Sequence, residues 1–123
     1  MDTLRIAVPS AVPGGLDAPV DAHFGHCEMY TVVDIKDRHI AAVGTLPNVP
    51  HGEGGCMAPV AFLAENGINV LIAGGMGMRP LLAFREIGID VYFGGDAPSV
   101  RAAVHACMAG SLPQFAPADT CAG

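Results

Sequence analysis

The feature that most constrains the fold is an alternation of helical and β-type stretches in the second half of the chain, between residues 57 and 110. Apolar residues at helical spacing predict helices at 57–65, 79–87 and 98–110, and apolar β-rich runs predict strands at 68–73 and 89–93. Strands that alternate with helices in this way are typically parallel and covered by the helices.

The first half of the chain predicts three more strands. The run "LRIAVPS" at 4–10 reads as a short strand that ends in Pro and Gly residues, and the runs at 29–35 and 39–46 read as two strands of a hairpin joined by "KDR". A hairpin next to parallel strands makes the sheet mixed. The sequence therefore predicts an α/β fold.

Length and composition exclude several classes of protein. A chain of 123 residues with 51% apolar residues fits one domain with an adequate core. The net charge of −6 with only six Lys and Arg argues against a nucleic-acid partner, because binding to phosphates needs clustered cations. No apolar run reaches the ~18 residues of a membrane helix, and the first residues lack the pattern of a secretory signal. We therefore expect a cytoplasmic domain at 1–112, followed by a mobile Pro- and Ala-rich tail at 113–123.

Four loops of this fold are candidates for one ligand-binding rim. In open α/β sheets, ligands gather where loops leave the carboxyl ends of the parallel strands. The loop at 10–17 and the Gly-rich loop at 74–79 would emerge together there, and the loops that contain His23 to Cys27 and His51 to Cys56 are candidates for the same rim.

The stretch "GGMGMRP" has two interpretations. It follows a strand and opens a helix, so its backbone N–H groups and the helix dipole suit an anion, but it equally fits a tight turn that needs glycine dihedral angles. It lacks the third glycine of a dinucleotide fingerprint and the lysine of a phosphate-binding P-loop. Arg79 favours the anion, since a cation at a helix start opposes the dipole unless a negative ligand joins them.

The His and Cys residues of the two other loops carry a second signal. Taken alone, the His-Phe-Gly stretch reads as a turn in which the imidazole caps a backbone carbonyl, and His51 and Cys56 are weak signals by themselves. Together, His23, His26, Cys27, His51 and Cys56 offer imidazole and sulfur donors, which suit zinc, copper or metal–sulfide clusters rather than magnesium or calcium. Their spacing matches no zinc finger. Met76 and Met78 could add soft, apolar walls, although filling the core is the ordinary role of methionine.

The chain also resembles a known family. The segments "DAPVDAHFGHCEMYTVVDI", "GCMAPVAFLAENGINVLIAGGMGMRPLLAFREIGIDVYFGG" and "SVRAAVHACMAGSL" are similar to the dinitrogenase iron–molybdenum cofactor-binding family, over about Leu4 to Leu112. Its strongest pieces here are the turn at His23–Phe24–Gly25 and the turn at Ala73 to Gly77. The family includes carriers of the nitrogenase cofactor and a small protein that holds a molybdenum–copper sulfide cluster.

The resemblance implies a ribonuclease H-like, three-layer fold with a five-stranded mixed sheet flanked by helices. It implies a non-enzymatic carrier of an anionic metal–sulfide cluster, of molybdenum–copper or iron–molybdenum type, with a protein donor or acceptor. The family match carries over His23, Gly25, Gly74, Gly75 and Gly77 as cluster-binding positions. From chemistry and loop placement we add the following residues, the two cysteines as possible direct metal ligands: His26, His51, Met76, Met78, Arg79, Cys27 and Cys56.

Other classes of function stay open at this point. A simple zinc- or copper-binding module is the nearest alternative, and it would take up a single ion without sulfide. A thiol hydrolase would need Cys27 paired with His23 or His51 and a third group to orient the histidine. A pure interaction module is compatible with the low charge. Nuclease activity is not expected, because Asp17, Asp21 and Asp34 are scattered over loop and strand.

Overall fold

The structure, a computed structural model, describes residues 3–21, 28–47, 57–76, 78–94 and 97–115. Its elements follow the predicted order, and each boundary lies within two residues of the expected one. The strands and helices are β1 (Thr3–Ser10), β2 (Met29–Lys36), β3 (His39–Pro47), α1 (Met57–Glu65), β4 (Val70–Ala73), α2 (Met78–Glu86), β5 (Asp90–Phe93) and α3 (Val100–Met108).

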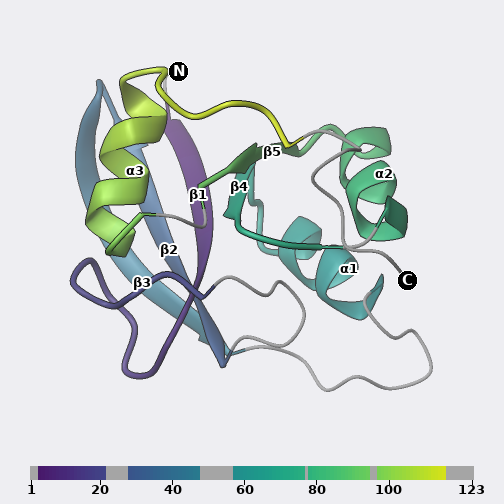
Figure 1. Cartoon of the computed structure of the whole chain (residues 1–123), viewed down its shortest axis with the longest axis horizontal. Coiled ribbons are helices and arrows are strands. Elements are labelled where there is room, and N and C mark those ends of the chain that lie inside the picture. Colours follow the sequence, from purple (N-terminus) through teal and green to yellow (C-terminus); the bar gives the residue numbers. More distant parts are fainter. Residues whose placement is uncertain (1–2, 22–27, 48–56, 77, 95–96, 116–123) are drawn as a thin grey trace.

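The five strands form one mixed sheet in the order β3-β2-β1-β4-β5 (Figure 1). Strands β1, β4 and β5 run parallel, whereas β2 is antiparallel to both of its neighbours, β1 and β3. This confirms the predicted α/β architecture with a mixed sheet.

Helices cover both faces of the sheet, and each face has its own core. On one face, Ala7 and Leu71 pack against residues of α1 and α2 such as Leu63 and Phe84, all fully buried. On the other face, alternate residues of the same strands, such as Ile6 and Val8, pack against α3. Figure 1 shows α1 and α2 together and α3 apart from them. Because the inner strands are covered on both sides, every residue of β4 is buried.

The hairpin between β2 and β3 is a two-residue turn. Asp37 and Arg38 both have positive φ angles, 52° and 67°, which is the turn geometry that matches the twist of a hairpin. The register shifts between Asp34 and Ile35, so that Ala41 of β3 has no partner on β2.

The residues after α3 extend the packed domain beyond the expected boundary at Leu112. The Phe93 N–H donates to the Pro113 carbonyl at 2.9 Å, and the Phe115 N–H donates to the Val91 carbonyl at 2.8 Å. Phe115 is fully buried, and its ring meets that of Phe93 edge to face, with centroids 5.7 Å apart. The segment 113–115, expected to be mobile, therefore lies along β5. Residues 116–123 of the expected tail lie outside the described part of the chain.

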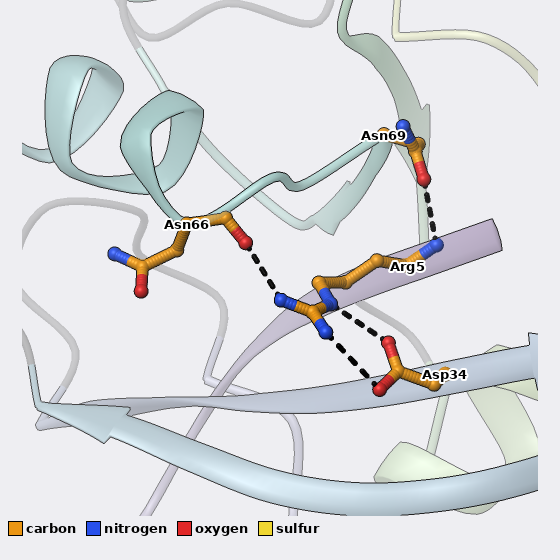
Figure 2. A network of polar contacts seen from close by, with 4 residues as sticks. All are labelled: Arg5, Asp34, Asn66 and Asn69. Atoms are coloured by element: carbon orange, nitrogen blue, oxygen red, sulfur yellow. Dashed lines mark hydrogen bonds and ion pairs between the residues drawn. The ribbon is translucent and has the colours of Figure 1, made fainter.

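A polar network joins β1 to its neighbours at the amino end of the strand (Figure 2). The Arg5 guanidinium donates to both carboxylate oxygens of Asp34, at 2.8 and 3.4 Å, and to the carbonyl of Asn66 at 2.9 Å. The Arg5 backbone N–H donates to Asn69 Oδ1 at 2.8 Å. The network ties β2 and the α1–β4 connection to β1 and uses Asp34 as a structural group.

Candidate functional site

The carboxyl ends of the parallel strands define the edge where a ligand was expected. Strand β1 ends there at Ser10, β4 at Ala73 and β5 at Phe93. The neighbouring strands align with them, because Ser10 pairs with Met29 at the start of β2, and Met29 pairs with Pro47 at the end of β3. The loops at 10–17 and 74–79 therefore leave from one edge of the sheet, as predicted.

The loop after β1 is held by a buried pair of hydroxyl groups. Ser10 Oγ and Thr31 Oγ1 are 2.7 Å apart, both residues are fully buried, and the Gly15 N–H donates to Thr31 Oγ1 at 3.0 Å. Gly14 has a φ of +74°, and a Cβ at this position would lie 2.6 Å from the sulfur of Met29. Only glycine fits there, so the "PGG" turn approaches β2 closely and has a defined position.

The junction between β4 and α2 contains five described residues of the predicted Gly-rich site. Gly74 is partly exposed, whereas Gly75 is buried. Met76 is only 3% exposed and belongs to the core beneath the turn, so its thioether does not form a surface wall. Met78 is 40% exposed, and Arg79 is also exposed at the start of the helix. Among the described residues of the junction, Gly74, Met78 and Arg79 therefore contribute to its outer surface.

Arg79 and Arg38 are the arginines without a partner among the described residues, and of the two only Arg79 lies at the carboxyl edge, because Arg38 is in the β2–β3 hairpin. Arg5 and Arg101 form ion pairs with Asp34 and Asp17, at 2.8 and 3.3 Å. Arg85 donates to the Phe115 carbonyl at 2.8 Å. Arg79 makes no hydrogen bond or ion pair with any residue that the structure describes. A guanidinium therefore stays available at the carboxyl edge.

The first turns of α2 and α3 differ in how their N–H groups are satisfied. In α3, the Ser99 side chain accepts from Ala102 N–H, and the N–H groups of Val100 and Arg101 donate to carbonyls of Ala18 and Leu16. The first turn of α2 has neither an acidic residue nor an acceptor from the described residues outside the helix. Free N–H groups beside a guanidinium attract an anion, so this end of α2 is the better candidate.

The remaining predicted site residues lie outside the described part of the chain. They are His23, Gly25, His26, Cys27, His51, Cys56 and Gly77. Asp21 and Glu28 border the first His/Cys loop, and Pro47 and Met57 border the second. Met29 and Pro47 align with Ser10 at the carboxyl edge, so the flanks of both loops meet the predicted rim.

The described residues offer no ready-made site for a bare metal ion. Across residues 3–21, 28–47, 57–76, 78–94 and 97–115, no group of three or more His, Cys, Asp or Glu is placed to hold one. An open hollow of about 640 Å³ lies at the opposite edge of the sheet, where Leu4, Arg38 and Cys107 are among its lining residues. Burial raises the pKa of the Cys107 thiol, which makes it a poor nucleophile.

The contact between the Ser10 and Thr31 hydroxyl groups was not predicted from the sequence. Isolated Ser and Thr residues at strand ends are too common to signal a contact between strands. The signal that could have indicated the pair is the "PGG" turn between β1 and β2, because a tight turn that crosses a strand needs a buried acceptor for its N–H groups.

Comparison with known proteins agrees with this architecture. The family model described as "Dinitrogenase iron-molybdenum cofactor" matches residues 4–110. The chain belongs to this family. The resemblance noted in the sequence is thereby confirmed, and the match covers the whole fold from the second residue of β1 to the end of α3.

Individual relatives extend the comparison. The MJ0580 protein of Methanocaldococcus jannaschii is 30% identical over 97 residues, which cover 76% of this chain and 80% of that protein. The apo form of the orange protein from Desulfovibrio gigas is 32% identical, with a TM-score of 0.76 over 91% of this chain and 92% of that chain. The MJ0327 protein of M. jannaschii has a TM-score of 0.75 over 94% and 98% of the two chains at 15% identity, a likeness of fold alone. No helix in the described part of this chain is long and apolar enough to cross a membrane.

Proposed function

We propose that the protein binds and carries an anionic metal–sulfide cluster, without catalysing a reaction, at the carboxyl edge of its sheet. The observation that carries this proposal is the unpaired, exposed guanidinium of Arg79 at the first turn of α2, beside N–H groups without a described acceptor. Family membership supports a role in binding a metal cluster. The cluster is the cargo of the protein, and it takes the role that a substrate has in an enzyme.

The chemistry of the cargo suits this edge. A sulfide cluster is bulky, soft and negative, while the protein has a net charge of −6, so binding requires local positive potential. Arg79 and the α2 amides provide it, and the exposed Met78 adds an apolar, polarisable wall. Because the cluster brings its own sulfides, hydrogen bonds to sulfur are enough to hold it, and no direct protein ligand is required.

The loops outside the described residues complete the proposed site. His23, His26 and His51 would donate to the cluster, and Cys27 or Cys56 could bind copper as thiolates. Glycines 25, 74, 75 and 77 would let the backbone approach, and Met76 would support the turn from below. The metals that we propose for the cluster are molybdenum and copper, with iron and molybdenum as the alternative. A cytoplasmic location, delivery to another protein and the ribonuclease H-like assignment of the fold belong to the same proposal.

A reconstitution experiment tests the proposal. Purified apo-protein is titrated with tetrathiomolybdate and copper(I), desalted, and examined by visible absorption and by analysis of molybdenum, copper and sulfur. The proposal expects coloured protein that retains both metals in a fixed ratio. Loss of colour on the column, with zinc or copper alone retained, would support the simple metal-binding module instead.

A charge-reversal pair locates the site. Arg79→Glu should lower cluster affinity about tenfold or more, because a charge-assisted hydrogen bond contributes about 1.5–3 kcal/mol. Its effect on folding should stay within about 0.5 kcal/mol, since Arg79 is exposed and glutamate suits a helix start. The matched control is Arg38→Glu, an equal change of charge at an exposed residue of the opposite edge. Equal retention by the two variants would refute the anion site at α2.

A further inference from the structure

The two outermost strands of the sheet, β5 and β3, differ in whether another segment pairs with their outer side. At the β5 edge, Gln114 forms a bridge with Tyr92, and the Phe93 and Phe115 N–H groups donate hydrogen bonds that join residues 113–115 to β5. The other edge is β3, and no described residue pairs with its outer side. Uncovered edges present unpaired N–H and C=O groups that can pair with another strand.

The chemistry of β3 does nothing to prevent such pairing. Residues Ala42 to Leu46 carry no charge, although the chain as a whole carries −6. Val43 is 42% exposed, and its neighbours from Ala41 to Thr45 are exposed as well. Natural edge strands are usually protected by a charged residue, a proline or a bulge. In β3 the irregularity at Ala41 and the proline at Pro47 lie at the two ends of a regular stretch of five residues, and neither protects the stretch itself.

This stretch is complementary to itself. An antiparallel pairing of two copies centred on Gly44 places Val43 of each copy opposite Thr45 of the other, a β-branched pair of the kind that stabilises antiparallel sheets. Gly44 stands opposite itself at the centre of this pairing and brings no side chain into it.

Charges at the two ends of β3 complement one another in the same arrangement. The hairpin end carries the exposed Lys36, Asp37 and Arg38, a net charge of +1, and the other end carries the exposed Glu28 beside Met29. Antiparallel pairing brings the hairpin of each copy toward the Glu28 end of the other. The hairpin of one copy and Glu28 of the other are at least two strand spacings of ~4.8 Å apart, which is more than the ~8 Å Debye length, so salt largely screens this attraction.

We propose that the β3 edge is a self-association surface, through which two copies pair antiparallel over Ala42–Leu46 to form a continuous ten-stranded sheet. The pairing covers the outer side of β3 in each copy, and residues 113–115 cover the outer side of β5. No third copy can therefore add to the sheet, and the assembly stops at two copies. Five residues per copy form an interface well below the ~1,200 Å² of stable complexes, so the dimer is weak, with a Kd of about 0.1–1 mM. This inference does not depend on the cargo.

Concentration-dependent NMR tests the proposal on the full chain, under reducing conditions that prevent disulfides between copies. Amide shifts are followed from about 0.02 to 2 mM, and sedimentation equilibrium gives the mass over the same range. Shifts should change with concentration at residues 40–47. A mixture of labelled and unlabelled protein should give NOEs from Val43 of one copy to Thr45 of the other. Constant shifts and monomer mass up to 2 mM, or NOEs between copies at another surface, would overturn the proposal.

A pair of lysine variants separates the edge from general charge effects. Val43→Lys should weaken self-association at least tenfold, because it places a charge in the strand pairing, and the exposure of Val43 lets the fold tolerate it. Ile87→Lys introduces the same charge at a β-branched residue of similar exposure, 51%, between α2 and β5 and should leave association unchanged. Equal weakening by the two variants, or none by Val43→Lys, would exclude the β3 edge.

Discussion

Replacing Thr31 by valine should destabilise the protein through the loss of one hydroxyl. Valine has nearly the same shape and suits a strand at least as well, so packing and β-propensity change little. What is lost is the acceptor for Gly15 N–H, at 3.0 Å, and the partner of the Ser10 hydroxyl, at 2.7 Å. Ser10 and Thr31 are both fully buried, so water cannot replace these contacts without a rearrangement.

The expected magnitude follows from two groups left without partners. Each buried polar group without a hydrogen bond costs about 1–3 kcal/mol, so two groups would cost about 2–6 kcal/mol. Because the Gly15 contact is only partly buried, we expect Thr31→Val to lower the free energy of unfolding by about 2–4 kcal/mol, in the lower part of this range. With a urea m-value of about 2 kcal/mol/M, the midpoint should fall by about 1–2 M. Thr31→Ser keeps the hydroxyl and is the matched control, with a loss of about 1 kcal/mol from the missing methyl group.

A second substitution separates the two lost contacts. Ser10→Ala combined with Thr31→Val removes the unpaired Ser10 hydroxyl and leaves only the Gly15 N–H without an acceptor, so the double variant should be more stable than Thr31→Val alone. Hydrogen exchange at the Gly15 amide should be faster in both variants that lack the Thr31 hydroxyl. If Thr31→Val and Thr31→Ser unfold at the same urea concentration, the assigned role of the hydroxyl is wrong.

Two further predictions concern the end of the packed chain and the half-buried thiol. Phe115→Ala should lower the free energy of unfolding, measured by urea denaturation, by about 3–5 kcal/mol, because the ring is fully buried against Phe93. The control, Phe115→Leu, should lower it by clearly less. A loss below about 1 kcal/mol for Phe115→Ala would contradict the docking of 113–115 on β5. At Cys107, burial raises the pKa above the ordinary 9.0, so alkylation followed by peptide mass spectrometry at pH 8 should be slower than for a free cysteine peptide. The neutral thiol is favoured in the folded state, so its contribution to stability is complete below the unfolded pKa and is lost as pH rises through the folded one; alkylation at the rate of the free peptide would contradict this.

Much of the candidate site could be anticipated because it depends on topology. Strand–helix alternation predicts parallel strands, and parallel strands bring the loops at 10–17 and 74–79 to one edge. The sequence could not indicate how single side chains are used there. Met76 and Met78 are alike in the sequence and two residues apart, but the first lies in the core and the second is exposed. The direction in which the chain leaves β4 decides between them, and three glycines in this turn permit many directions.

The sequence by itself determined the secondary structure and the family, because both depend on local patterns: apolar periodicity, the hairpin turn and the ordered turns of the match. Only the tertiary structure decided which strands lie at the edges. The apolar runs of β3 and β4 look equally suited to burial, yet β4 is fully buried and most of β3 is exposed. The tertiary structure also decided that Arg5 and Arg101 form ion pairs with Asp34 and Asp17, whereas Arg79 has no partner among the described residues. Both outcomes depend on contacts between residues far apart in the chain, which no local pattern encodes.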